Sequence, residues 1–349
     1  MPAPVLEVDS LTKEFAVSSG FVSRLLGNTE WLTAVRDVSF EVGKGETVAL
    51  VGESGAGKST VGNIITRVHN PSSGAVRYRD DDVHGLTGEG LTEYRQSVQM
   101  VFQDPYSSLD PRYRVGSTIA EPLKIHTDLT ASEREDRVTD LLKTVNLDPV
   151  FADRFPHELS GGQLQRVSIA TALSVDPEFI ILDEPVSALD VSVQAQILNL
   201  LMELQRGRDL SYLFISHDLS VVKHLSDRVA VMYLGEIVEQ GDTAGLFEDP
   251  VHPYTEGLLA SVPQANPDDH RRGQRLTGEV PSPVDSPMGC SFHPRCEYAT
   301  EECTEMNPAL EEVFAGRDAA CHNWKEVANG TETDSDTLTI AEESGDAED

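Results

Sequence analysis

Apolar and polar residues alternate from Val5 to Val17, a period-two pattern that predicts a strand with one buried face. A second strand is predicted over residues 34–42. Thr47 to Val51 is a short continuous run of β-forming residues that ends in glycine, which fits a strand buried on both faces. A glycine-rich turn follows, and a helix is expected to start near Lys58. The first part of the chain is therefore predicted to be rich in strands.

Further along, the pattern changes to helical and then back to short buried strands. Residues from about 105 to 175 are predicted to be mainly helical, and buried strands are expected at Phe179 to Leu182 and at Tyr212 to Ser216. Strands that alternate with helices indicate an α/β fold, a doubly wound core with a mostly parallel sheet. Residues 18–32 lie between the first two predicted strands and are expected to form a loop-like insertion.

The C-terminal third has a different composition. Glycine and proline return over 240–253, residues 263–287 read as a proline-rich and polar linker, and 329–349 contain no lysine or arginine. Such an acidic segment has little with which to form a core. We expect three parts, which are a main domain over 1–250, a C-terminal extension over 251–325, and a disordered acidic tail over 326–349.

The chain is strongly acidic. Its 59 Asp and Glu residues against 27 Lys and Arg give a formal net charge of −32. This excess disfavours nucleic-acid binding, which needs a basic surface. Concentrated salt screens such self-repulsion, because the Debye length falls to about 3 Å at 1 M. We therefore favour a salt-loving source organism over a mesophile protein with a charged tail.

No segment reads as a membrane anchor or a signal peptide. The N-terminal residues lack a basic region followed by an apolar one, and no apolar run approaches the roughly 20 residues of a membrane span. We expect a cytoplasmic chain that reaches the membrane only through partner subunits.

A phosphate-binding loop follows the buried strand. The segment GESGAGKS from Gly52 matches the pattern of glycine, four residues and Gly-Lys-Ser, between a strand and a helix as the motif requires. Glycines let backbone N–H groups wrap phosphates, Lys58 can reach the β- and γ-phosphates, and the Ser59 hydroxyl can hold Mg²⁺. The strand and helix on either side count against a chance glycine turn. The expected ATP-binding residues are Gly52, Glu53, Ser54, Gly55, Ala56, Gly57, Lys58, Ser59 and Thr60.

Two carboxylates end the second buried strand. Asp183 suits Mg²⁺ coordination, directly or through water, and Glu184 is a candidate general base for an attacking water. Two acids can also simply end a strand, but the phosphate loop upstream favours the functional interpretation.

Further motifs resemble those of ABC ATPases. The segment Leu159-Ser160-Gly161-Gly162-Gln163 is similar to the signature sequence of that family and precedes the Asp183-Glu184 pair, as the family order requires. Four more positions match the family. Gln103 resembles the Q-loop glutamine, which is also a Mg²⁺ ligand, and Asp190 resembles the D-loop aspartate. His217 resembles the switch histidine, and Phe15 resembles the aromatic residue that stacks on adenine. A lone histidine after a strand is often structural, and a strand aromatic often belongs to the core.

The resemblance implies a mechanism. Two such subunits meet head to tail, so that Ser160, Gly161 and Gly162 of one contact the γ-phosphate bound by the other, and Gln163 supports this loop. His217 would contact the γ-phosphate and organise Glu184 and water. ATP binding closes the pair, hydrolysis reopens it, and Gln103 reports the nucleotide to the membrane subunits.

The chain also resembles the oligopeptide and dipeptide importer ATPases, over about residues 5–325. Matching segments include QMVFQDPYSSLDPR from Gln99, DEPVSALDVSVQAQILNLL from Asp183 and HPYT from His252. The sequences of these segments and the insertion at 18–32 are similar to those of the F-type ATPase of that family. This implies a heterodimer with a D-type ATPase, two transmembrane permease subunits and an extracellular solute-binding protein. Leu164 and Thr171 depart from the usual residues after the signature.

Other functions stay open at this point. A soluble ABC ATPase of DNA repair or translation is the alternative, although the chain lacks long heptad runs and a second phosphate loop. The transported solute is open as well, because members similar to this branch carry peptides, nickel chelates or oligosaccharides.

All four cysteines lie in the C-terminal extension, separated by gaps of five, six and seventeen residues: Cys290, Cys296, Cys303 and Cys321. A disulfide is not expected in a cytoplasmic chain. A close Cys-x-x-Cys pair, more usual for zinc, is absent from the sequence. Four thiolates can hold an iron–sulfur cluster, and the importer resemblance implies a [4Fe–4S] cluster. Free thiols, or zinc with His293 or His322, are the alternatives.

Overall fold

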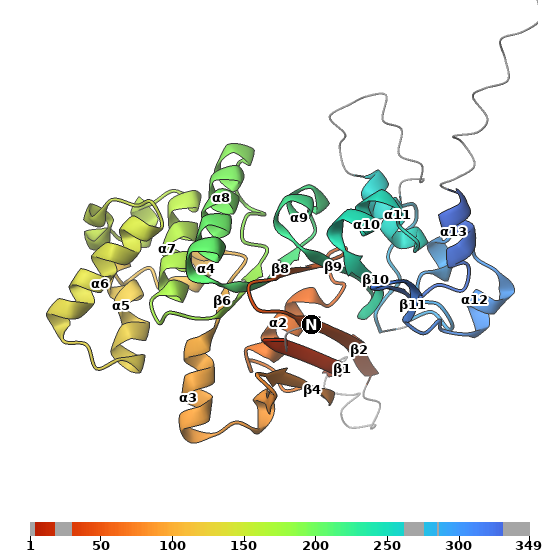
Figure 1. The fold of residues 1–349 in the computed structure, drawn as a ribbon, viewed down its shortest axis with the longest axis horizontal. Helices are drawn as coiled ribbons and strands as arrows, with labels where there is room; N and C mark the ends of the chain where they lie inside the picture. The colour runs from red at the N-terminus through yellow and green to blue at the C-terminus, as the bar shows by residue number, and fades with distance from the viewer. Residues whose placement is uncertain (1–3, 18–29, 262–275, 285, 331–349) are drawn as a thin grey trace, which may run out of the picture. The chain divides into compact units, whose positions relative to one another are not determined.

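A computed structural model describes residues 4–17, 30–261, 276–284 and 286–330 (Figure 1). The chain divides into two compact units, Met1–Ile237 and Val238–Asp349, so the first unit ends before the boundary predicted at residue 250. Most of the predicted insertion (18–29), much of the predicted linker (262–275 and 285) and the tail from 331 onward lie outside the described residues.

A parallel sheet forms the centre of the first unit. Its strands run in the order β6-β7-β8-β3-β9, and each neighbouring pair is parallel. All residues of β3, β7 and β8 are buried, as expected for strands covered on both faces. The expected α/β core is confirmed with strands β3 (Thr47–Val51), β6 (Val98–Val101), β7 (Phe179–Asp183), β8 (Ser211–Ser216) and β9 (Arg228–Tyr233).

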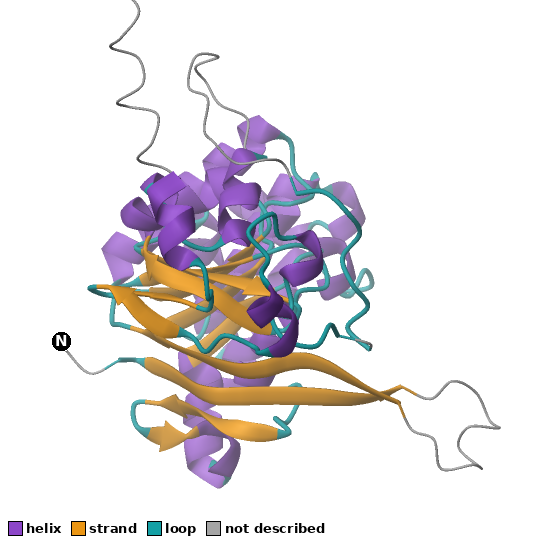
Figure 2. Ribbon diagram, turned by 90° about the vertical axis from the view of Figure 1, so that its right-hand side faces the viewer, coloured by secondary structure: helices purple, strands orange, loops and turns teal. Residues whose placement is uncertain are grey.

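The N-terminal strands form a second, antiparallel sheet in the order β2-β1-β4-β5. Leu6 lies opposite Val42 on one side and opposite Tyr78 on the other. Figure 2 shows the two long strands β1 and β2 running beside the more compact parallel sheet. The bounds are β1 Leu6–Val17, β2 Glu30–Val42, β4 Ser73–Tyr78 and β5 Asp81–Asp82. The second strand begins earlier than the residue 34 predicted from its pattern.

The helices between β6 and β7 form the helical subdomain that the sequence predicts over about 105–175. Here α5, α6 and α7 pack on one another through apolar side chains such as Ile119, Leu123 and Leu142. The subdomain comprises α4 (Pro105–Ser108), α5 (Val115–His126), α6 (Ala131–Thr144), η2 (Pro149–Asp153), η3 (Pro156–Glu158) and α7 (Gly161–Leu173). The remaining helices of the first unit are α2 (Lys58–Ile65), η1 (Val83–Gly85), α3 (Gly88–Ser97), α8 (Val191–Arg208) and α9 (Leu219–Leu225).

The second unit combines short strands and helices. Strand β12 pairs antiparallel with both β10 and β11. Its elements are β10 (Glu236–Asp242, which starts at the unit boundary), α10 (Thr243–Glu248), α11 (Pro253–Ala260), η4 (His293–Arg295), α12 (Glu301–Glu305), β11 (Glu311–Phe314), β12 (Arg317–Ala319) and α13 (Trp324–Gly330). Residues 326–330, which composition assigned to the acidic tail, therefore belong to helix α13, where the side chain of Val327 is buried.

A buried ion pair holds the second unit together. Glu239 on β10 is fully buried and accepts hydrogen bonds from the backbone N–H groups of Val251 and His252 and from the Arg317 guanidinium, at 3.0–3.1 Å. Burial raises the pKa of Glu239, and the charge of Arg317 together with the hydrogen bonds from Val251 and Arg317 opposes that rise. These bonds tie the segment before α11 to strands β10 and β12.

Candidate active site

The phosphate loop connects β3 to α2, and its glycines are fixed by close backbone neighbours. Gly52 has φ 151° and Gly57 has φ 103°. A Cβ at Gly52 would lie 2.1 Å from the carbonyl oxygen of Met232, and one at Gly57 would lie 2.2 Å from that of Ala34. Both contacts are far too short for any side chain. Glycine at these two positions therefore lets the loop turn against the neighbouring strands.

Lys58 starts helix α2 and is only 4% exposed. Its ammonium donates to the carbonyl oxygens of Gly52 and Glu53, at 2.8 and 2.9 Å. Burial lowers the pKa of Lys58, and the nearby carboxylates of Glu184, Asp183 and Glu53 oppose the shift. The loop thus holds a buried cation where a phosphate group would bring negative charge.

Ser59 and Asp183 lie together beside this lysine. The Ser59 hydroxyl donates to Oδ1 of Asp183 at 3.1 Å, and Asp183 is 6% exposed at the end of β7. Burial raises the pKa of Asp183, the charge of Glu184 adds to the rise, and the Ser59 hydrogen bond and Lys58 oppose it. Hydroxyl and carboxylate oxygens are the ligands that Mg²⁺ prefers, usually one or two from protein with the rest from phosphate and water. The pair fits a magnesium site.

Glu184 is held between two of the other predicted residues. Its Oε2 accepts from Nε2 of Gln103 at 2.7 Å, and its Oε1 lies 3.1 Å from Nδ1 of His217. Glu184 also has φ 45°, a left-handed conformation that is unfavourable for a side chain of this size. Its N–H donates to the carbonyl oxygen of Ile215 at the end of β8, which helps to hold that turn. The carboxylate is therefore fixed by strands β6, β7 and β8 together.

The signature segment caps helix α7 in a reciprocal arrangement. Oγ of Ser160 accepts from the N–H of Gln163 at 3.4 Å, and Oε1 of Gln163 accepts from the N–H of Ser160 at 2.9 Å. Gln163 thus holds the backbone at the start of α7. Such capping satisfies backbone donors at the start of the helix. The two glycines that follow Ser160 carry no side chain.

Helix α8 packs directly against these glycines. A Cβ at Gly162 would lie 2.4 Å from Cγ1 of Val193, and one at Gly161 would lie 3.2 Å from Cδ2 of Leu189. The backbone oxygen of Asp190 caps α8 by accepting from the N–H of Val193 at 2.8 Å. The signature and the D-loop are therefore neighbours within one subunit. The sequence resemblance includes Leu189 in the D-loop, but the contacts of Leu189 and Val193 with these glycines were not predicted, since neither residue carries a reactive group.

The structure brings some predicted residues together and leaves others apart. Lys58, Ser59, Asp183, Glu184, Gln103 and His217 converge at the carboxyl edge of the parallel sheet. Among the described contacts, none joins the signature residues to the phosphate loop. Phe15 lies half-buried on β1. Its ring centroid is 5.3 Å from that of His69 in a T-shaped arrangement, and the Lys13 ammonium lies 5.0 Å from the Phe15 centroid.

The four cysteines gather in the second unit. The N–H of Cys290 donates to the carbonyl oxygen of Cys303, and Cys303 is 6% exposed. Burial raises the pKa values of Cys296 and Cys321 to about 12, and Cys290 and Cys303 add to both shifts. Within the described residues, however, no three His, Cys, Asp or Glu side chains are placed to hold a metal ion.

No helix in the described part of the chain is both long and apolar enough to cross a bilayer.

Two family models match the chain. The ABC transporter model matches residues 35–187, and the model of the oligopeptide/dipeptide transporter C-terminal region matches residues 238–303. The first match contains the phosphate loop and the pair Asp183 and Glu184. The second contains three of the four cysteines.

Curated relatives cover nearly the whole chain. It is 50% identical over 322 residues to the probable peptide ABC transporter ATP-binding protein y4tS of Sinorhizobium fredii, covering 92% of this chain and 90% of that protein. It is 46% identical over 318 residues to the dipeptide transport ATP-binding protein DppF of Haemophilus influenzae, covering 91% and 96%.

Solved structures show the same fold. The ATP-binding cassette MJ0796, solved as a dimer in a post-hydrolysis state with ADP and Pi, matches with a TM-score of 0.60 and 29% identity, over 68% of this chain and 98% of that one. The alternative of a soluble ABC protein of DNA repair or translation finds no support among these relatives. The chain is therefore an ATPase of the ABC transporter family and belongs to its branch of oligopeptide and dipeptide transport ATP-binding subunits.

Proposed function

We propose that this subunit powers the import of dipeptides or oligopeptides by hydrolysing ATP at the site around Glu184. The observation that carries the proposal is the position of this carboxylate, held by Gln103 and His217 beside the Ser59–Asp183 pair. A carboxylate fixed on both oxygens is positioned to take a proton from an attacking water. The peptide solute is inferred from the relatives, which are named for peptide and dipeptide transport.

Each group in the site has a distinct part in the proposed reaction. Lys58 and the loop N–H groups bind the β- and γ-phosphates, and Phe15 stacks on the adenine. Ser59, Asp183 and Gln103 would hold Mg²⁺, which supplies charge neutralisation at the phosphate oxygens when it is bound. Glu184 accepts the proton of the attacking water, and His217 orients Glu184 and contacts the γ-phosphate.

The signature residues would act on the nucleotide of a second subunit. Ser160 and the glycines at the start of α7 lack any described contact with the phosphate loop of their own chain. In a head-to-tail dimer these groups would meet the γ-phosphate that the other subunit binds, with Asp190 at the same interface. We propose a related D-type ATPase as that second subunit, with two permeases and an extracellular solute-binding protein completing the importer at the cytoplasmic face of the membrane.

Co-purification tests this assembly. The tagged chain is recovered from detergent-solubilised native membranes in concentrated salt, and its companions are identified by mass spectrometry. We expect a second ABC ATPase, two permeases and a solute-binding protein. Recovery of ribosomes or DNA-repair proteins without permeases would overturn the transport function and leave the ATPase assignment in place.

We also propose that the four cysteines hold a [4Fe–4S] cluster. Four sulfur donors in one small unit suit such a cluster. In the described part of the chain these side chains are not placed as a set of three or more ligands, so cluster binding would have to bring them together. Iron and acid-labile sulfide, measured after anaerobic purification, should each approach four per chain. Zinc without iron, or metal-free thiols, would refute the cluster.

The acid excess leads to a separate prediction about salt. With a net charge of −32, the folded chain should melt at a higher temperature in about 1 M KCl than in about 0.01 M KCl, where the Debye length is about 30 Å. Sucrose at matched osmolality is the control, because it favours burial without screening charge. Equal melting temperatures in the two KCl concentrations would contradict adaptation to salt.

A further inference from the structure

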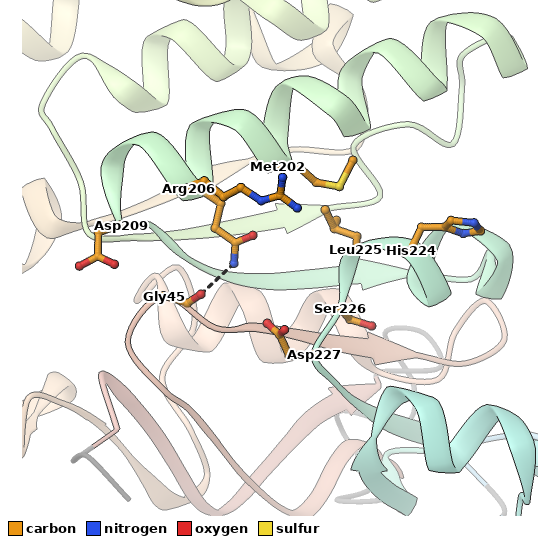
Figure 3. A pocket seen from close by; sticks show the side chains of 9 residues that line it. Gly45, Met202, Arg206, Asp209, His224, Leu225, Ser226 and Asp227 are labelled. Atoms are coloured by element: carbon orange, nitrogen blue, oxygen red, sulfur yellow. Dashed lines mark hydrogen bonds between the residues drawn. The ribbon is translucent and has the colours of Figure 1, made fainter.

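A cavity of about 370 Å³ lies in the first unit, away from the phosphate loop (Figure 3). Its walls are the C-terminal end of α8, the C-terminal end of α9, and the turn before β3 that contains Gly45. Thr47 is paired with Tyr212, and Val48 with Arg228, so the cavity lies at the amino ends of β3, β8 and β9. The ATP site is at the opposite, carboxyl ends. The volume falls within the usual range of small-molecule pockets, about 300–1,000 Å³.

One wall of the cavity carries a free cation. Arg206, in the last turn of α8, makes no hydrogen bond or ion pair within the described part of the chain, whereas its neighbour Arg208 bonds to Asp176. In Figure 3 its guanidinium lies toward Met202 and Leu225. A guanidinium presents paired N–H donors that match a carboxylate. This wall therefore suits an acidic group.

Two other side chains that line the cavity, Asp227 and His224, offer hydrogen-bond acceptors. Asp227 is held by the N–H of Thr47, which donates to its Oδ2 at 2.8 Å. Nδ1 of His224 lies 2.8 Å from the carbonyl oxygen of Ser220, which can only accept. Nδ1 must therefore carry the proton, and Nε2 of the neutral ring is an acceptor. A carboxylate and an imidazole nitrogen together suit an ammonium group.

The two helices that line the cavity both begin at the ATPase machinery. Helix α8 starts directly after Asp190, and α9 starts after His217 and Asp218, whose side chain accepts from the N–H of Ser220. A ligand that bridges Arg206 on α8 and His224 on α9 fixes the distance between their C-terminal ends. Such a ligand stabilises one relative position of the helices, and so biases the groups at their other ends.

We propose that this cavity binds a small zwitterion, a free amino acid or a short peptide, and that its occupation lowers ATP turnover. The carboxylate would pair with Arg206, and the ammonium with Asp227 and His224. The choice of ligand rests on the proposed function, since these are the molecules that a peptide importer delivers into the cell. The site thus makes the rate of ATP hydrolysis depend on the concentration of imported peptide or amino acid in the cell.

Calorimetric titration of the purified full chain tests the binding. The probes are dialanine, N-acetyl-dialanine and dialanine amide. We expect saturable binding of dialanine, and binding at least about tenfold weaker when either end is blocked, because each block removes a charged hydrogen-bonding group. Absence of saturable binding, or equal affinity for all three probes, overturns the proposal.

Two arginine variants locate the site. Arg206→Ala should abolish the preference for dialanine over dialanine amide, whereas Arg208→Ala, two residues away and outside the cavity wall, should keep it. A preference that survives in Arg206→Ala would overturn the assignment. Dialanine should also lower ATP turnover of the co-purified complex with the wild-type chain and not with Arg206→Ala, and unchanged turnover would overturn the regulatory role.

MgATP binding, measured on the same samples, distinguishes a failure of the cavity proposal from a failure of the proposed function. Intact ATP binding with no dialanine binding overturns the cavity proposal alone, whereas absent ATP binding contradicts the proposed function itself.

Discussion

Replacing Glu184 by glutamine should lower ATP turnover by about 10²–10⁴-fold, the usual contribution of a general base. The amide has nearly the same size, and its oxygen can still accept from Nε2 of Gln103, so the arrangement of the site is kept. It cannot take the proton from water. ATP affinity should stay near the wild-type value, because the groups that bind the phosphates are unchanged. Steady-state turnover and nucleotide titration on one preparation measure both effects.

A matched control lies at the other end of the same strand. Glu178 precedes β7 and pairs with Arg79 on the surface, away from the phosphate loop. Glu178→Gln should leave turnover unchanged, as expected for a surface substitution. If Glu184→Gln hydrolyses ATP as fast as Glu178→Gln, Glu184 is not the general base.

Replacing Lys58 by methionine should weaken ATP binding by about 10²-fold, equivalent to about 3 kcal/mol for the loss of a buried charged partner of phosphate. Lys58 is buried in the loop, and its pKa is lowered by that burial, so its charge is costly in the protein without nucleotide. Methionine fills a similar volume without the charge. The melting temperature should therefore be equal or higher, while nucleotide titration shows the loss.

Lys143→Met provides the comparison for Lys58. This lysine lies on α6, exposed and paired with Asp140, and its removal should leave ATP affinity unchanged. An affinity for ATP in Lys58→Met close to that of Lys143→Met would show that the phosphate loop does not bind nucleotide as proposed.

The sequence predicts best where burial and motif agree. The strands β3, β7 and β8 are short apolar runs, and each is followed directly by a functional segment, so both strand and site could be located from their pattern. The sequence predicts catalytic roles for Gln103, Glu184 and His217, and in the structure Gln103 and His217 lie 2.7 and 3.1 Å from the Glu184 carboxylate. Their roles in catalysis stay predictions until turnover is measured.

Features set by long-range contact were not predictable from local pattern. Strand β6 has only four residues and is recognisable through its pairing with β7 rather than through its own periodicity. The contact of Val193 with Gly162 joins two helices distant in sequence, and no reactive group marks it. The left-handed conformation of Glu184 depends on the bond to Ile215 on another strand. Composition likewise placed residues 326–330 in the tail, although Val327 supplies an apolar side chain that α13 buries.

The clearest test of the central claim is peptide uptake by the complete importer reconstituted in vesicles. The labelled dipeptide is supplied with its binding protein on one side, and MgATP is placed on the side of the ATPases. We expect uptake that requires ATP, that persists with Glu178→Gln and that falls sharply with Glu184→Gln. Uptake of equal rate with Glu184→Gln, or ATP hydrolysis with no dipeptide transport, would contradict this expectation.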